Sequence, residues 1–258
     1  MLLPDYGADV LKLQSPSGNL LESSAAFRVW NRGKKSVALD LSQPEDLRAS
    51  LKLARDADVF LESFRPGVAE RLGVGYSAIK DANLGIIYCA ISAFGSGGPW
   101  AYRHGYEGLV SAASGTMTDE VGVRDGPMFC SIKMASIGAN MFALHGILAS
   151  LHVRNICGIG QKVETSMYQG AMAIRSPMLP GSTRYRKNPD YSNLRQVGVQ
   201  VLFSETPSSD RLPAANLGQH SVEILQELGF SELEISDLRD ARCIGVPWLV
   251  LTTRAAPS

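Results

Sequence analysis

The chain has 258 residues, 45% of them hydrophobic, and its 25 basic and 25 acidic side chains leave no net formal charge. This length allows one sizeable core, and the balanced charge argues against non-specific binding to nucleic acid or to an anionic membrane. The 4 cysteines are widely separated without a CxxC pair, and no run of about 18 uninterrupted apolar residues occurs, so we expect a soluble, cytoplasmic protein with reduced thiols.

Short apolar runs alternate with helical segments in the first 91 residues. The strand-like runs are residues 8–13 (ADVLKL), 57–61 (ADVFL) and 85–91 (GIIYCAI). Residues 44–57 carry leucines at helical spacing, with Ser42 and Pro44 as a helix start, and residues 76–83 form a shorter helical piece. This alternation predicts parallel βαβ units in an open, mostly parallel, Rossmann-like α/β sheet with flanking helices.

The first residues are typical of the junction between a helix and the second strand of a doubly wound sheet. The sequence opens on MLLPDYGADVLKL without an earlier strand and helix. We therefore expect the first βα unit of such a fold to be missing from this chain.

The second half predicts helices separated by irregular sequence. Residues 139–154 form a helix with small residues on one face, ended by CGIG at 157–160, and an alternating stretch at 162–165 leads into another helix. Residues 177–213 are rich in Pro, Ser, Arg and Asn without periodicity. Two short amphipathic helices follow, with Gly229 ending the first and Ser231 with Glu234 starting the second as a capping box.

Four stretches occur in an order and spacing that resemble one family. They are NRGKKSVALDL (31–41), ADVFLESFRPGVAERLGVGY (57–76), SAFGSGGPW (92–100) and RNICGIGQKVETSMYQGA (154–171). The chain resembles the family III CoA-transferases, the group of formyl-CoA transferase, carnitine CoA-transferase and 2-methylacyl-CoA racemase. The resemblance covers residues 2 to about 176 and returns at 217–239.

The resemblance implies a CoA-transferase that moves CoA between an acyl-CoA thioester and a carboxylic acid. Its ligand would be coenzyme A, its partners small molecules and a second copy in a homodimer, with no metal, nucleic acid or membrane. It implies a CoA-binding α/β domain over 1–176, a shortened linker or small subdomain over 177–213, and a C-terminal helical segment over 214–258 that returns to the main domain.

The residue types in these stretches suit the chemistry of CoA. A basic cluster of Arg32, Lys34 and Lys35 precedes a strand and could bind a phosphate. Phe64 and Arg65 follow the end of a strand, where α/β sheets place ligands. Each feature alone would be a solvated turn or a core aromatic, and their combination favours the ligand site. The glycines of residues 92–100 let backbone amides approach a thioester closely.

The candidate CoA contacts form one set. They are Arg32, Lys35, Leu39, Asp40, Leu41, Ser42, Ser63, Phe64, Arg65, Arg71, His104, Gly105 and Tyr106, of which all but Arg32 and Lys35 rest mainly on the resemblance. His104 replaces a lysine of formyl-CoA transferase. Two roles remain for His104: its imidazole binds a CoA phosphate, or it is an exposed loop histidine without a ligand.

The candidate catalytic residues are Ser136 and Glu107. The resemblance implies an aspartate nucleophile that forms an anhydride and then an enzyme thioester, and its position falls on Ser136. No acid occurs between Asp125 and Glu164. A serine ester would be a poor acyl donor back to a thiol, and a serine needs a base. His145 is expected to pack within its helix, and Glu107 is expected to take a positioning role rather than that of nucleophile.

Two other functions follow from the departures at this position. The missing aspartate favours a non-catalytic CoA-binding relic or regulatory partner of an active paralogue as the alternative. A racemase is less favoured, because its histidine and aspartate positions fall on Tyr106 and Ser136. The sequence contains no Walker-type nucleotide motif and no metal-ligand cluster, so neither site is predicted.

Overall fold

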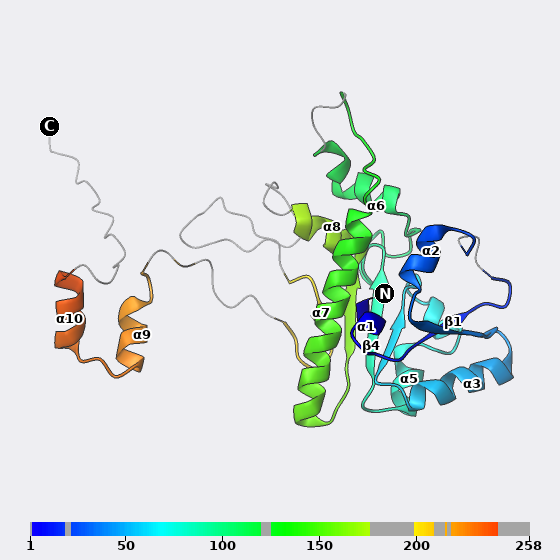
Figure 1. The fold of residues 1–258 in the computed structure, drawn as a ribbon, viewed down its shortest axis with the longest axis horizontal. Helices are drawn as coiled ribbons and strands as arrows, with labels where there is room; N and C mark the ends of the chain where they lie inside the picture. Colours follow the sequence, from blue (N-terminus) through cyan, green and yellow to red (C-terminus); the bar gives the residue numbers. More distant parts are fainter. Residues whose placement is uncertain are drawn as a thin grey trace. The chain divides into compact units, whose positions relative to one another are not determined.

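The computed structural model describes residues 2–18, 22–119, 125–175, 199–208, 215 and 218–241 of the chain. Two compact units divide it (Figure 1): Met1–Lys187 with Leu194–Ser209, and Asn188–Asn193 with Asp210–Ser258. Most of the predicted linker, residues 177–213, lies outside the described residues. The return of residues 214–258 to the main domain stays a prediction.

The first part of the larger unit alternates strands with helices, as the sequence predicts. Its elements are α1 (Leu2–Asp5), β1 (Val10–Gln14), α2 (Ala25–Trp30), β2 (Lys34–Ala38), α3 (Pro44–Arg55), β3 (Val59–Glu62), α4 (Val68–Arg71), α5 (Tyr76–Ala82) and β4 (Ile87–Ser92). Helix α3 begins at Pro44, with acids in its first turn and basic residues in its last, both favourable to the helix dipole. Ser42 is not the cap of this helix, because the N-cap position is Gln43, and the Ser42 hydroxyl donates to Asp40.

The second part is built around one long helix. Its elements are α6 (Glu107–Ser114), η1 (Thr116–Thr118), α7 (Met134–Cys157), β5 (Lys162–Ser166), α8 (Met167–Arg175) and β6 (Leu202–Phe203). Helix α7 contains the predicted helix and starts five residues before it. Gly158, with a φ of 75°, ends α7 at the predicted CGIG turn. The alternating stretch after this turn forms strand β5, and the helix predicted to follow it is confirmed as α8.

The strands form two sheets. Strands β1 and β2 pair in parallel in a two-stranded sheet, and the order of the larger sheet is β3-β4-β5-β6, with only β6 antiparallel. The predicted fold class, α/β with mostly parallel strands, is confirmed. The first predicted strand, however, pairs with the segment before α3 and not with β3 or β4.

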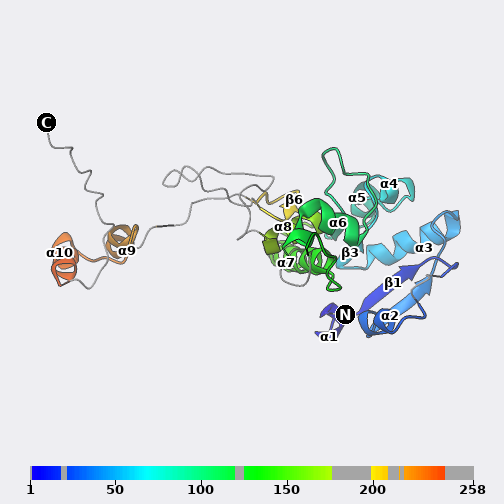
Figure 2. The ribbon, with the colours of Figure 1, turned by 90° about the horizontal axis from the view of Figure 1, so that it is seen from above.

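Helices cover both faces of the larger sheet. Phe60 and Tyr88 point to one face and pack in a cluster with residues of α3 and α5, and Ile87 points to the other face in a cluster with α7. Figure 2 shows α7 on one side of β3 and helices α3 and α5 on the other. Such burial on both faces is the usual condition of parallel strands, and it explains their continuous apolar sequence.

Glycines bring α7 and α8 into close contact. A Cβ added at Gly138 of α7 would lie 2.7 Å from the backbone of Gly170, and one added at Gly170 would lie 2.4 Å from the amide nitrogen of Ala139. No other residue type fits at these positions without movement of a helix. Gly138, which lies one residue before the predicted helix, and Gly170 therefore fix the start of α7 against α8.

Helix α7 is, among the described residues, the one helix long and apolar enough to cross a membrane. Length and composition alone are weak evidence for that role. The helix packs on β4, β5 and α8 and supplies buried residues to the core, as a central helix of an α/β unit does.

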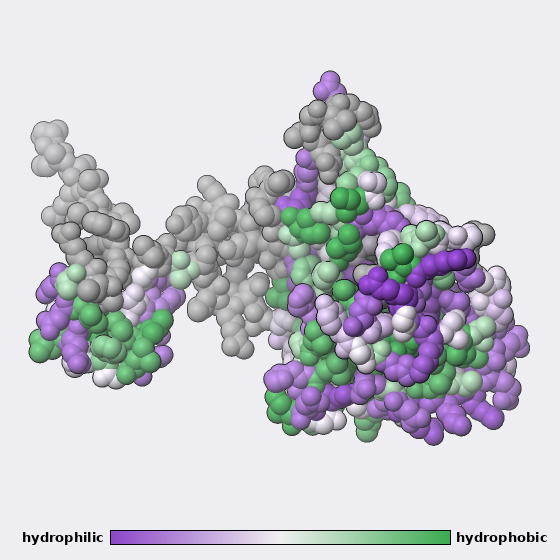
Figure 3. All heavy atoms as spheres, viewed as in Figure 1, coloured by the Kyte–Doolittle hydropathy of each residue, from purple (hydrophilic) through white to green (hydrophobic). Residues whose placement is uncertain are grey.

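The smaller unit contains two short helices, α9 (Ser221–Glu227) and α10 (Glu232–Asp240). Gly229, at a φ of 90°, follows the end of α9, and Ser231 with Glu234 forms the predicted capping box of α10. The hydrogen bonds from Ser231 lower the pKa of Glu234. Hydrophobic side chains lie at the surface of this unit (Figure 3), including Ile224, Leu228, Phe230 and Leu233.

Candidate functional site

The start of α7 is capped by an acid from another helix. Glu107 Oε1 accepts a hydrogen bond from the Ala135 amide at 2.8 Å, and Glu107 Oε2 accepts from the Ser136 amide at 3.1 Å and the Ser136 hydroxyl at 2.5 Å. Lys133, the N-cap residue of α7, makes no side-chain cap. Glu107 therefore satisfies helix amides that would otherwise have no intrahelical partner.

Two helix N-termini meet at this carboxylate. Glu107 is the first residue of α6 and lies at the N-terminus of α7 through its hydrogen bonds, and both termini favour a negative charge. Ala135 is fully buried in a cluster with Ala93, Val110 and Ala171. The packing of α6, α7 and α8 thus positions the Glu107 and Ser136 pair.

The structure brings together the two predicted catalytic residues. Glu107 and Ser136 are 29 residues apart in the chain and in direct hydrogen-bond contact, and both are partly buried. The residues flanking Ser136 provide no base, as the sequence indicates, but α6 provides a carboxylate. His145 bonds the Met141 carbonyl of its own helix through Nδ1, as a helix histidine does, but its side chain is exposed and not packed.

The glycine-rich loop begins beside the start of α7. Phe94 packs in the same cluster as Ala135 and lies edge-on to Trp100, with ring centroids 5.5 Å apart. A Cβ added at Gly95, Gly97 or Gly98 would meet no atom within 4 Å, so these positions border open space. The loop has room for a ligand to approach its backbone.

Residues 104–107 (HGYE) connect this loop to α6, whose first residue is Glu107. The rings of His104 and Tyr106 stack at a centroid distance of 5.8 Å, and both side chains are exposed. Gly105 lies against Ala93, where a Cβ would be 3.1 Å from the Ala93 side chain. His104 is therefore an exposed loop histidine, and its imidazole is accessible to a ligand phosphate.

The predicted basic turn is paired with acids of the N-terminal segment. The Arg32 guanidinium donates to both Asp5 oxygens, at 3.1 and 2.6 Å, and Lys35 Nζ donates to Asp9 at 2.8 Å. The hydrogen bond to Asp5 raises the pKa of Arg32, and the same bond lowers the pKa of Asp5. Both cations are exposed, so the pairs can exchange with a ligand phosphate.

A cation–π contact joins α2, the helix before the basic turn, to the start of α7. The ammonium group of Lys133, the N-cap residue of α7, lies 5.0 Å from the ring centroid of Trp30 at the end of α2. Arg32 follows two residues later. The basic turn and the Ser136 position are therefore on neighbouring elements.

The segment after β2 combines core and turn positions. The Leu39 amide donates to the Gln14 carbonyl at 2.9 Å, and Leu41 packs partly buried against the core cluster around Tyr88. Asp40 accepts bonds from the Ser42 hydroxyl and amide, and these bonds lower the pKa of Asp40. Leu41 has a packing role whether or not it contacts a ligand.

The segment after β3 is exposed, as a ligand platform would be. Ser63 and Arg65 are exposed, Phe64 is 40% exposed, and Arg71 lies exposed at the end of α4. The Phe64 amide donates to Glu62 Oε2 at 2.6 Å. Burial raises the pKa of Glu62, and this hydrogen bond opposes the increase. Among the described residues no hydrogen bond, ion pair or ring contact joins this turn to the Arg32 turn.

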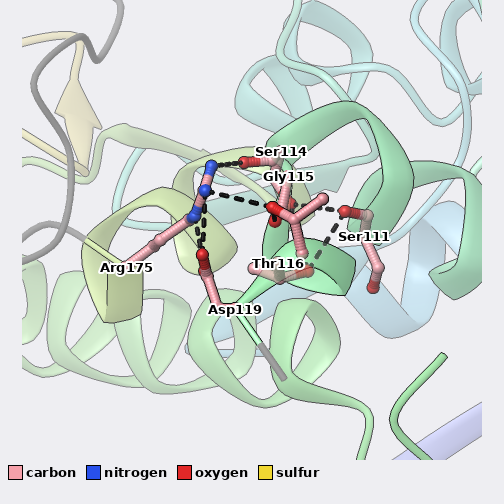
Figure 4. Close-up of polar contacts among 7 residues, drawn as sticks. Ser111, Ser114, Gly115, Thr116, Asp119 and Arg175 are labelled. Atoms are coloured by element: carbon pink, nitrogen blue, oxygen red, sulfur yellow. Dashed lines mark hydrogen bonds and ion pairs between the residues drawn. The ribbon is translucent and has the colours of Figure 1, made fainter. Parts of the chain in front are cut away.

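An arginine that the sequence did not single out fastens α6 to α8 (Figure 4). Arg175, the last residue of α8, donates to Asp119 through Nε and Nη2 and to the Ser114 carbonyl at the end of α6, the last at 2.6 Å. Gly115 has a φ of 78°, and a Cβ there would lie 2.3 Å from Arg175 Nη1. Since α6 carries Glu107, this clamp supports the site from its far end.

The sequence was compared with protein families and with known proteins. The model of CoA-transferase family III matches residues 1–201. The chain is 33% identical to the acetyl-CoA:oxalate CoA-transferase of Acetobacter aceti, over 67% of the chain and 47% of that protein. It is also 33% identical to the succinyl-CoA:glutarate CoA-transferase of Mus musculus, over 67% and 42%.

Solved structures agree. A CAIB/BAIF family protein from Brucella suis has a TM-score of 0.64 at 30% identity, over 68% of this chain and 50% of its own. The hypothetical protein Rv3272 from Mycobacterium tuberculosis has a TM-score of 0.63 at 32% identity, over 67% and 51%. The chain spans about half the length of the relatives it matches. It belongs to CoA-transferase family III.

Proposed function

We propose that this chain is a CoA-transferase that moves CoA between an acyl-CoA thioester and a carboxylic acid. The observation that carries the proposal is the Glu107–Ser136 pair at the start of α7, beside the open glycine-rich loop, in a chain of this family. A carboxylate in this place suits acyl transfer, because each covalent intermediate that it forms is itself a good acyl donor.

The CoA portion of the substrate would bind on the predicted contact residues. Arg32 and Lys35 are exposed cations that exchange Asp5 and Asp9 for phosphate oxygens, and Phe64 offers an exposed ring for the adenine. Exposed ion pairs are weak in water, so this exchange costs little.

Net transfer tests the proposal. The full chain is incubated with acetyl-CoA, succinyl-CoA or formyl-CoA and with oxalate, glutarate or mesaconate, and the thioesters are separated by chromatography. We expect a new CoA thioester from at least one donor and acceptor pair. Hydrolysis to free CoA without a new thioester, for every pair, would contradict transferase function.

A second candidate is a CoA-binding protein without turnover that regulates an active paralogue. Ser136 at the position that the resemblance assigns to aspartate favours it, as does the use of Glu107 to cap α7. Calorimetry with CoA beside the transfer assay separates the candidates: binding without any transfer would support this second function.

Assembly and compartment complete the proposal. We place the protein in the cytoplasm as a homodimer that needs no metal. The exposed apolar side chains of Ile137, Met141 and Leu148 on α7 are suited to an interface. Light scattering on the purified chain tests the dimer: the mass of a single chain would contradict it.

A further inference from the structure

The carboxylate of Glu107 lies where CoA transfer needs a nucleophile. Resting on the transferase function above, we propose that Glu107 itself forms the covalent intermediates. Its Oε2 is 2.5 Å from Ser136 Oγ, so α6 delivers a carboxylate to the position that the resemblance assigns to the nucleophilic aspartate. The acid missing from α7 is supplied by the neighbouring helix.

The hydrogen bonds leave the carboxylate able to react. Oε2 is occupied by the Ser136 hydroxyl and amide, and Oε1 receives the Ala135 amide. The Ser136 amide also lies 3.4 Å from Oε1 and shares its one proton between the two oxygens. A carboxylate offers about four lone-pair sites, so Oε1 keeps one with which to attack.

The first half of the reaction ends with CoA on the enzyme. Oε1 of Glu107 attacks the thioester carbonyl carbon, the carbon–sulfur bond breaks, and CoA thiolate leaves a mixed anhydride of the acyl group and Glu107. The thiolate then attacks the Glu107 carbonyl carbon and expels the donor's carboxylate. The products are a Glu107–CoA thioester and a free acid anion, without a net gain or loss of protons or electrons.

The second half reverses these steps with the acceptor. The acceptor carboxylate attacks the Glu107 carbonyl carbon and expels CoA thiolate, giving a new anhydride. The thiolate attacks the acceptor carbonyl carbon, the new acyl-CoA leaves, and the Glu107 carboxylate is restored.

The start of α7 would stabilise the charge that develops in these steps. Whenever the Glu107 carbonyl carbon is attacked, its remaining oxygen, Oε2, becomes negative while it accepts hydrogen bonds from the Ser136 amide and the Ser136 hydroxyl. Preorganised donors of this kind commonly contribute about 100- to 1,000-fold to a rate. Ser136 acts in this arrangement as a donor and not as the attacking atom.

Mapping the intermediate in the wild-type chain tests the assignment. The full chain is mixed with acetyl-CoA, succinyl-CoA or formyl-CoA and treated with borohydride, which reduces an enzyme thioester to an alcohol. It is then digested for peptide mass spectrometry. We expect the reduced side chain at Glu107. An acyl ester on Ser136, an adduct on another residue, or transfer without any Glu107 adduct would overturn the assignment.

Substitutions give a second, independent measurement. We expect Glu107→Gln to lower the transfer rate by about 1,000-fold or more, as loss of a nucleophile does. Ser136→Ala should lower it less, roughly 10- to 100-fold, because the Ser136 amide remains as a donor to Oε2. Glu45→Gln, at an exposed acid of α3, is the matched control and should be unchanged. Circular dichroism verifies that Glu107→Gln keeps α7, and if it does not, the wild-type mapping decides.

The outcomes separate this inference from the function on which it rests. Transfer that persists in Glu107→Gln and is lost in Ser136→Ala would remove Glu107 as nucleophile and leave a transferase. A wild-type chain that transfers CoA from none of the three thioesters would overturn the proposed function, and the assignment of Glu107 with it.

Discussion

At the scale of single residues, the chemistry depends on the environment of two carboxylates. Glu107 is held by amides and a hydroxyl at the start of α7, whereas Glu62 is partly buried and accepts a hydrogen bond from the Phe64 amide. Burial raises the pKa of Glu62, so its ionisation is disfavoured in the folded protein.

A second acid beside Glu107 should destabilise the fold at neutral pH. Ser136→Asp places a carboxylate within contact of Glu107, and like charges at this distance favour protonation of one of them. We expect a loss on the order of 1–3 kcal/mol in the free energy of unfolding at pH 7 and a smaller loss at pH 5. Ser136→Asn is the uncharged control, and equal losses for both variants at both pH values would contradict this electrostatic account.

The raised pKa of Glu62 should also make the free energy of unfolding depend on pH. Its pKa is raised in the folded state, so its ionisation costs stability as pH rises through its ordinary and then its folded pKa. Glu62→Gln removes that cost. We expect the wild type to gain stability relative to the variant as pH falls from 7 to 4, measured by urea unfolding. A difference that is constant over this range would show that burial does not perturb Glu62.

At the scale of elements, close helix packing positions the site. The contact of Gly138 with Gly170 sets the distance between α7 and α8, and the Arg175 clamp joins α8 to α6. Both contacts stabilise the arrangement that brings Glu107 to Ser136. Their loss should be felt at the site as well as in the stability of the fold.

Gly138→Ala should destabilise the protein by about 1–3 kcal/mol, because its Cβ would meet the Gly170 backbone at 2.7 Å. Gly97→Ala is the matched control, since a Cβ there meets nothing within 4 Å, and it should change the free energy of unfolding by less than about 0.5 kcal/mol. Thermal unfolding measures both. A Gly138→Ala variant as stable as the control would mean that the helices can separate without cost.

Elements with strong local signals were predictable from the sequence, and long-range pairings were not. Pro44, the CGIG turn and the Ser231–Glu234 box mark their helix ends correctly, because these signals act within a few residues. The pairing of β1 with β2 in a separate sheet depends on contacts that periodicity does not encode. The prediction of Ser42 as the helix start is one residue off, because Gln43 takes the N-cap position and Ser42 donates to Asp40 in the preceding turn.

The site was predictable only in part for the same reason. Counting along the motifs identified Ser136, and the resemblance indicated that Glu107 could lie near it. The hydrogen bond between them spans 29 residues and required the packing of α6 on α7. Arg175 carries no motif, and only its contacts with Asp119 and Ser114 reveal its role.

At the scale of the whole molecule, the chain spans about half the length of its relatives and still contains the residues proposed to bind CoA. Phe64→Ala should weaken CoA binding roughly 5- to 100-fold, the range expected for the loss of one aromatic stacking contact. Phe230, also 40% exposed but in the smaller unit, is the matched control. Calorimetry measures both, and equal affinities for CoA would exclude Phe64 from its site.

Isotope exchange between a free carboxylate and its own CoA thioester tests the central claim most directly. Labelled acetate with acetyl-CoA, and labelled succinate with succinyl-CoA, require only the enzyme-bound thioester and no knowledge of the natural acceptor. CoA transfer with Glu107 as the nucleophile predicts that label enters the thioester of at least one pair in the wild type and of neither pair in Glu107→Gln. A wild-type chain that binds CoA yet exchanges no label in either pair would contradict it.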